Sequence, residues 1–154
     1  MSNSPRQMLL PLLIAITLAG CAGHPPEPPS VTETSAARAD LADRVQFIEN
    51  YVTFRRKYVK LDYDVMYQNN GGGLIPAPSD WDIRLIAEVP PAEIDDWVPV
   101  GADKIAVSQP EWLRELPGSI ERNGITEWYR KSGTVVAIDR TRSIVAYWNT
   151  TMPE

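Results

Sequence analysis

Residues 59–68, which read VKLDYDVMYQ, decide the fold class of this chain. Apolar or aromatic side chains at positions 59, 61, 63, 65 and 67 alternate with polar ones at 60, 62, 64 and 68, and only Met66 interrupts the pattern. A period of two residues is typical of a β-strand that is buried on one face and wet on the other. The sequence therefore predicts a half-buried strand here, of the kind found in antiparallel sheets.

Similar strand patterns occur downstream of this segment. Residues 81–89, WDIRLIAEV, alternate in the same way until two prolines end the run. Three shorter segments, 126–130, 134–139 and 143–148, are separated by turn-forming residues at 131–133 and 140–142. Short helices are predicted over 91–97 and from Ser108, where Ser108 and Glu111 match a capping box.

Upstream of the first strand, the spacing predicts one long helix over residues 37–57. Leu41, Val45 and Ile48 recur at spacings of four and three, and an aromatic stripe with the same spacing runs from Phe47 to Tyr58. Ser35 is the expected N-cap, and the basic residues 55–57 would offset the helix dipole. We therefore predict an α+β fold over residues 37–154, with this helix packed on a mostly antiparallel sheet of about five strands.

The N-terminal segment has the layout of a secretory signal. An apolar run at residues 8–19 follows Arg6 and is too short to cross a bilayer, which takes about 20 residues. It ends in LAGC at 18–21, which resembles the lipobox of bacterial lipoproteins. The resemblance implies that residues 1–20 are cleaved, that Cys21 receives a diacylglyceryl group, and that its new amine is acylated.

The resemblance also predicts a location. In enterobacterial lipoproteins an aspartate after the cysteine favours the inner membrane, so Ala22 favours the outer membrane, with the chain facing the periplasm. Residues 21–36 are rich in proline, serine and threonine and read as an extended tether. The alternative is a conventional signal, cleaved after the small residues Ala19 and Gly20, which would release an unanchored protein.

Charge and composition exclude several classes of partner and chemistry. Removing Arg6 with the signal leaves 14 basic and 20 acidic residues from the original 15 and 20, a net charge of −6, which disfavours nucleic acid. The one cysteine cannot form an internal disulfide, and the one histidine, His24, lies in the tether. The folded part thus lacks the residues of Ser-His-Asp triads, Cys-His pairs and ordinary zinc sites, and we expect no cofactor and no metal.

Carboxylates are the remaining candidates for catalysis. Asp62 and Asp64 share one predicted strand face, and Asp80 and Asp82 share another, beside Arg84. If the two strands pair, these groups would approach the 5–10 Å separation of glycosidase carboxylates. Solvated carboxylates on a wet strand face are the simpler interpretation, so we predict no catalytic residue.

Tryptophans and one loop are the candidate binding features. Trp97 and Trp112 lie outside the predicted strands, where an indole can form a flat contact surface. The loop that contains Gly71, Gly72 and Gly73 leads to Asp80 and Trp81, and loops carried on a rigid sheet often bind ligands.

These observations favour a non-enzymatic, lipid-anchored envelope protein that binds another envelope protein, as an accessory subunit or as an inhibitor or immunity-type factor. A glycan- or peptidoglycan-binding module that uses Trp97, Trp112 and the glycine-rich loop is the alternative. A carboxylate enzyme acting on glycans is the third hypothesis.

Overall fold

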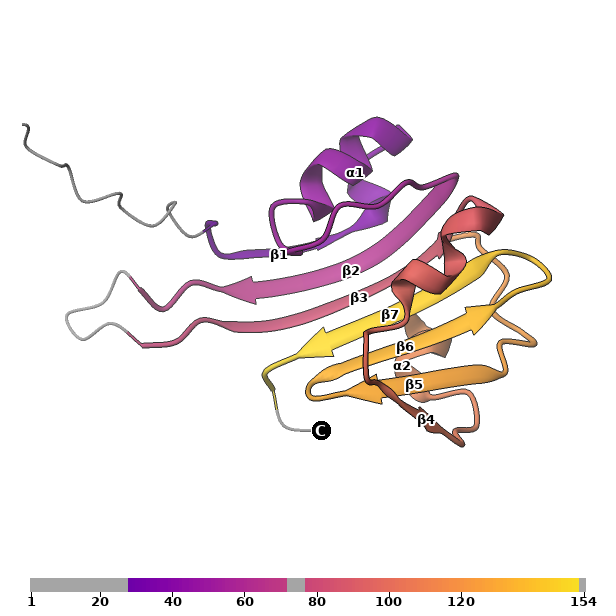
Figure 1. Cartoon of the computed structure of the whole chain (residues 1–154). Coiled ribbons are helices and arrows are strands. Elements are labelled where there is room, and N and C mark those ends of the chain that lie inside the picture. The colour runs from indigo at the N-terminus through magenta and orange to yellow at the C-terminus, as the bar shows by residue number, and fades with distance from the viewer. Residues whose placement is uncertain (1–27, 72–76, 153–154) are drawn as a thin grey trace, which may run out of the picture.

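The computed structural model describes residues 28–71 and 77–152, which form one seven-stranded antiparallel sheet (Figure 1). The strand order is β1-β2-β3-β7-β6-β5-β4. The strands are β1 (Val31–Thr34), β2 (Lys60–Gln68), β3 (Asp80–Glu88), β4 (Asp103–Ile105), β5 (Glu127–Lys131), β6 (Thr134–Asp139) and β7 (Ile144–Thr150). The helices are the 3-10 helices η1 (Ser35–Ala37) and η2 (Pro91–Trp97) and the α-helices α1 (Leu41–Ile48) and α2 (Glu111–Glu115). None of the described residues lies in a helix long and apolar enough to cross a membrane.

The five strands predicted from alternation are present, and the count of about five is wrong because two edge strands were missed. β2 pairs with β3, β5–β6–β7 form the meander, and β3 pairs with β7 to join the two parts. β1 has only four residues and β4 only three, too few for alternation to be recognised. Residues 31–34, assigned to the tether, instead pair with β2 from Val31 opposite Tyr67 to Thr34 opposite Asp64.

The long helix predicted over residues 37–57 is absent, and this is the main error in the predicted fold. The chain forms η1, breaks, and then forms α1 of eight residues with Asp40 at its N-cap. After Ile48 come aromatic and β-branched residues, which have low helix propensity, and the amides of Asn50 and Tyr51 bond three residues back. The fold is therefore mostly β, with short helices only.

The aromatic stripe that suggested a helix packs on the sheet as an irregular segment. Phe54 lies 5.1 Å from the Trp97 ring and 5.2 Å from the Tyr147 ring, both edge-on. Burial of these side chains needs only that they reach the sheet, and an irregular chain meets that need as well as a helix does. The spacing of three and four residues therefore reflects which side chains contact the sheet, and it does not require a helical backbone.

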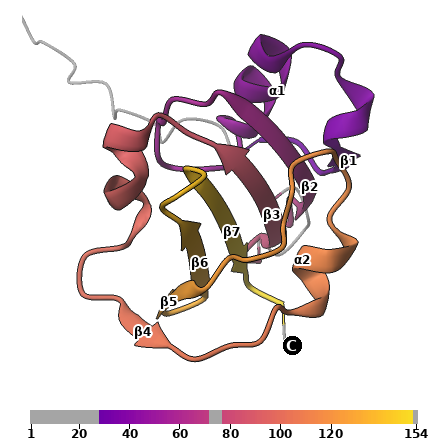
Figure 2. The same cartoon turned by 90° about the vertical axis from the view of Figure 1, so that its right-hand side faces the viewer.

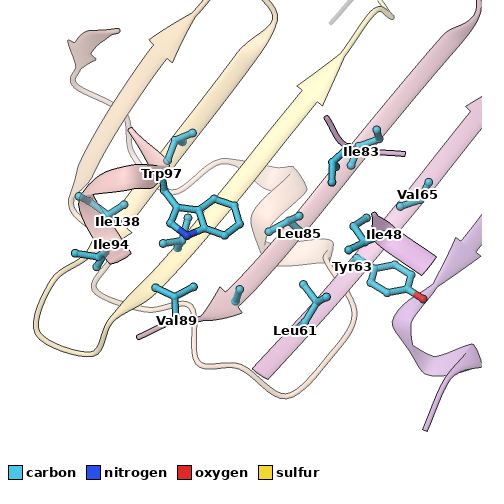
Figure 3. Close-up of a cluster of buried hydrophobic side chains, with 14 of the residues drawn as sticks. Ile48, Leu61, Tyr63, Val65, Ile83, Leu85, Val89, Ile94, Trp97 and Ile138 are labelled. Atoms are coloured by element: carbon cyan, nitrogen blue, oxygen red, sulfur yellow. The ribbon is translucent and has the colours of Figure 1, made fainter. Parts of the chain in front are cut away.

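The first face of the sheet carries the larger of two hydrophobic cores. Leu61, Tyr63 and Val65 of β2 lie beside Ile83 and Leu85 of β3, as Figure 3 shows. α1 covers the β2 side of this face and η2 covers the side nearer β6 and β7. The buried residues of this core are Phe47, Ile48, Val52, Leu61, Tyr63, Val65, Ile83, Leu85, Ala87, Val89, Ile94, Trp97, Val136, Ile138 and Val145.

The second face carries a separate core beneath α2. Strand alternation places Ile86, Val135 and Ala146 on this face, and Trp112 and Leu113 of α2 pack over them. The predicted capping box does not form, because Pro110 is the N-cap residue of α2 and no side chain caps the helix. After α2 the chain crosses to the β2 side of the sheet and then returns to β5 (Figure 2).

A buried carboxylate holds this crossing segment to the sheet. Asp62, predicted to be solvated, is only 3% exposed and accepts hydrogen bonds from four donors in three segments. Arg44 Nη1 and Ser35 Oγ bind Oδ1 at 2.9 and 3.4 Å, and the amides of Ser119 and Ile120 bind Oδ2 at 2.8 and 3.2 Å. We call Asp62 and these four residues the Asp62 clasp. It joins η1, α1 and the segment after α2 to the two carboxylate oxygens of one residue on β2.

Gly118 provides a direct test of the clasp. A Cβ at this position would lie 2.1 Å from Asp62 Cγ, so Gly118→Ala must displace either the carboxylate or the crossing segment. Breaking a buried, hydrogen-bonded charge costs about 3–5 kcal/mol, and we expect a loss of unfolding free energy of that size by urea titration.

Gly101→Ala is the control for a positive φ without a steric clash, because φ is +74° at Gly101 and +122° at Gly118, and a Cβ at Gly101 meets nothing within 4 Å. It should cost only the backbone strain, about 1–2 kcal/mol. Equal losses in the two variants would show that Asp62 does not hold the crossing segment.

Candidate functional site

A groove on the second face of the sheet is the strongest candidate site. It has a volume of about 580 Å³ and lies between α2 and strands β3 to β7 of the sheet. Trp112, Trp128 and Trp148 line it together with the charged pair Asp82 and Arg84. We call these five residues the tryptophan groove.

Strand register and α2 together bring the three indoles into one place. Trp148 of β7 lies opposite Arg84 of β3, and Trp128 of β5 lies on the same face. Trp112 reaches them from α2, with its ring 5.7 Å from Trp148 and 6.5 Å from Trp128. Trp128 is 1% exposed and Trp112 is 8% exposed, whereas Trp148 is half-buried. The first two therefore form the floor, and Trp148 presents the larger accessible surface.

Asp82 fixes the polar end of the groove. The Nε1 atom of Trp148 donates to Asp82 Oδ1 at 2.6 Å, and Arg84 Nη2 lies 2.5 Å from Asp82 Oδ2. Both carboxylate oxygens are thus engaged, so Asp82 orients the indole and the guanidinium rather than standing free as a base or nucleophile. A carboxylate held this way supports binding better than it supports acid–base catalysis.

The carboxylates that were predicted to converge lie in two different settings. Asp64 is directly opposite Arg84 in the β2–β3 register, so the predicted approach to Arg84 is confirmed for Asp64 and Asp82. Burial raises the pKa of Asp64, the charge of Arg84 opposes that shift, and the charge of Asp82 adds to it. Asp62, by contrast, belongs to the clasp, and Asp80 lies at the start of β3.

The rim of the groove adds charged residues of both signs. Glu111 and Glu115 lie on the exposed side of α2, and Arg130 extends from β5. With Asp82 and Arg84 at one end, the groove offers an apolar floor with acidic residues along one wall. This is a suitable setting for an apolar side chain next to a positive charge.

Trp97, a predicted contact residue, is instead a core residue. It is 4% exposed, lies in the first core against Phe54 and Tyr58, and points onto the sheet (Figure 3). Because η2 turns its last residue inward, this indole packs in the first core and does not line the tryptophan groove. Trp112, the other predicted contact residue, does line the groove.

The remaining predicted binding residues gather at the end of the β2–β3 hairpin. The amide of Gly71 donates to Asn69 Oδ1 at 2.9 Å, and Asn70 Nδ2 donates to the exposed Asp80 at 3.1 Å. Trp81 is half-buried on the first face, with its Nε1 bonded to Asn149. Gly72 and Gly73 lie outside the described residues, as does Cys21, and the structure brings none of the described ones to the tryptophan groove.

Sequence reasoning missed Trp148 as a site residue. The available signal was the alternation of side chains along β7. Val145 and Tyr147 belong to the first core, so Trp148 must face the other side of the sheet. This alternation indicates a shared site with Arg84 only when the strand beside β7 is known. That strand is β3, which is far from β7 in the sequence.

The described residues contain no cluster of three or more potential metal ligands of the histidine, cysteine, aspartate or glutamate type. Comparison of the chain with protein families, curated proteins and solved structures finds no match. We therefore infer the function from the chemistry of the site.

Asp64 should make stability depend on pH. Because its pKa is raised in the folded state above the ordinary value of 3.8, the folded state binds more protons as Asp64 titrates, and stability falls as the pH rises through that window. Asp64→Asn removes this penalty, so at pH 7 the variant should unfold at a higher urea concentration than the parent. At pH 3, where the parent carboxyl is protonated in both states, the two midpoints should converge.

Asp103→Asn, on the exposed strand β4, is the control and should leave the midpoint nearly unchanged at both pH values. A lower midpoint for Asp64→Asn at pH 7 would mean that the attraction of Arg84 outweighs burial at this site.

Proposed function

We propose that this chain is a lipid-anchored, non-enzymatic protein of the bacterial cell envelope that binds another envelope protein through the tryptophan groove. The observation that carries the proposal is the meeting of three indoles with the Asp82–Arg84 pair in one open groove. Tryptophan and arginine are the residues most enriched at the energetic centres of protein interfaces. An accessory subunit and an inhibitor or immunity-type factor both fit this description.

The absence of an evident catalytic set supports a binding role. The sequence places no histidine or cysteine after position 24, so nucleophile pairs based on these residues have no source in the folded part. Asp82 and Asp62 both have their oxygens engaged by neighbouring donors. Direct proton transfer by either carboxylate would require one of these donors to be displaced by a substrate.

The rim predicts the character of the partner. Glu111 and Glu115 are exposed on one wall of the groove, so the matching segment should carry an apolar or aromatic side chain flanked by lysine or arginine. Such rim charges act mainly on the rate of association, while the buried indoles determine how long the complex lasts.

Charge reversal on α2 tests this proposal. Glu111→Arg combined with Glu115→Arg should reduce recovery of the crosslinked partner from intact cells at least tenfold, as measured by quantitative mass spectrometry. Arg114→Glu is the matched control, because Arg114 is exposed on the same helix but does not line the groove, and it should leave recovery unchanged. If the parent recovers no envelope protein above background, or if both variants lose recovery equally, the groove is not the binding surface.

The proposed anchor is tested by the intact mass of the chain purified from membranes. We expect a chain that starts at Cys21 and is heavier by a diacylglyceryl group and one further acyl chain. Cys21→Ala should lose both the added mass and the membrane association. An unmodified chain cleaved nearby would instead indicate an unanchored, secreted protein.

Glycan binding is the second candidate, and the Trp148–Asp82 pair favours it. An indole fixed beside a carboxylate offers a flat apolar surface and a hydrogen-bond acceptor side by side. Sedimentation with isolated peptidoglycan sacculi separates the two candidates: a glycan-binding chain co-sediments, and Trp148→Leu reduces the bound fraction. A chain that stays in the supernatant has no such activity.

A further inference from the structure

We propose that one end of the domain faces phospholipid headgroups, so that the protein is held in a defined orientation on its membrane. This end, which we call the anchor pole, comprises residues 28–30, 67–71, 77–81 and 149–152. It is where the described chain begins, beside the end of β2 and the start of β3 (Figure 1). The inference depends on the proposed lipid anchor at Cys21 and adds an orientation and a lipid-facing surface to it.

Three hydrogen bonds hold the first described residues, 28–30, against the rest of the domain. The side-chain amide of Asn69 donates to the Pro28 carbonyl at 2.9 Å, and the Asn69 backbone amide donates to Ser30 Oγ at 2.9 Å. The Tyr51 hydroxyl donates to the Pro29 carbonyl at 3.3 Å. Only the segment before Pro28 is therefore left to serve as a spacer, which makes the spacer much shorter than the tether predicted from sequence.

The length of that spacer limits the height of the domain above the membrane. Pro28 lies seven positions after Cys21, and a fully extended chain of that length spans at most about 25 Å. Part of this length lies within the headgroup layer, which is about 5–8 Å thick in each leaflet. Pro28 thus lies within about 20 Å of the membrane surface.

The opposite end of the domain cannot reach the membrane within this limit. β2 comprises nine residues, from Lys60 at the far end to Gln68 at the anchor pole, a length of about 30 Å. η2 and the turn between β6 and β7 also lie at the far end (Figure 1). For the far end to face the bilayer, the anchor pole would have to stand farther away than the spacer allows.

The charge distribution agrees with this orientation. Of the 17 described residues of the anchor pole, Asp80 alone is charged, although the whole chain has a net charge of −5. The ion pairs Lys57–Glu93, Lys60–Glu88 and Arg140–Asp95 lie at the far end. An almost uncharged end is repelled less by anionic headgroups than the rest of an acidic surface is.

Aromatic side chains make the anchor pole suited to the headgroup region. Tyr67 and Trp81 are cross-strand neighbours, and the ring of Tyr51 lies 5.4 Å from that of Tyr67. All three are half-buried and line a small cleft of about 280 Å³ with Pro28 at its edge. Tyrosine and tryptophan are the residues enriched where proteins meet the membrane–water interface.

This orientation leaves the tryptophan groove open to a partner. The chain is fastened on the α1 side of the sheet, through Tyr51, whereas the groove lies on the opposite face. Thr150 and Met152 of the anchor pole line one end of the groove, so the groove begins at the anchor pole. A partner in the groove would therefore bind close to the membrane surface, through a membrane-proximal segment of its own.

The test is paramagnetic relaxation enhancement in lipid nanodiscs that contain a gadolinium-labelled headgroup lipid. The chain from Cys21 onward, which contains every described element, is coupled through the Cys21 thiol to a maleimide lipid. We expect the amide signals of Asn70 and Thr151 to be broadened at least fivefold more than those of Asp96 and Thr141 at the far end. Equal broadening, or stronger broadening at the far end, would overturn the proposal.

Because the lipid is attached chemically, this result does not depend on whether cells lipidate Cys21, which the intact mass decides separately. A second chain, with 20 Gly/Ser residues inserted between Ala22 and Gly23, tests the role of spacer length. We expect the contrast between the two ends to fall at least twofold. A contrast that persists unchanged would overturn the argument that the short spacer imposes the orientation.

Discussion

The Asp62 clasp is the constraint on which the arrangement of this domain depends. β1 pairs with β2 only from Asp64 onward, so the edge of β2 at Leu61 and Asp62 lacks a strand partner there. Arg44 fills that gap by donating to the Leu61 carbonyl as well as to Asp62. The crossing segment then closes over the carboxylate from the second face. A buried charge is costly unless every donor is in place, so the clasp favours one relative placement of α1 and the crossing segment.

That placement explains why a small sheet without a disulfide can keep two cores. α1, η1 and η2 cover the first face, and α2 with the crossing segment covers part of the second. The second cover is incomplete, because α2 has only five residues and the strands beneath it extend farther. The uncovered part is the tryptophan groove. Its existence follows from the shortness of α2 and from the clasp, which draws the following chain to the β2 side.

The parts of the fold that could be predicted were those that depend on local pattern. β2 and β3 were found to within a residue or so because alternation over nine residues is hard to obtain by chance. β1 and β4 were missed because short edge strands are recognised by their partners and not by their own composition. The long helix was predicted because apolar spacing of three and four residues arises wherever a chain lies across a core, with or without helical hydrogen bonds.

The site shows the same division between local pattern and long-range pairing. Trp112 was singled out for lying outside the strands, and it lines the groove although it is only 8% exposed, whereas Trp97 satisfied the same criterion and packs in the first core, away from the groove. The difference lies in the direction in which each short helix faces the sheet, which no local pattern records. Asp62 and Asp82 look equivalent in sequence, because each lies on the polar side of an alternating run and is the third residue of its strand. One became structural because an amide-bearing segment closes over it, and the other holds an indole at the edge of an open groove. What a carboxylate does in this fold is therefore decided by which distant segment reaches it, and only the pairing of β3 with β7 and the path of the crossing segment determine that.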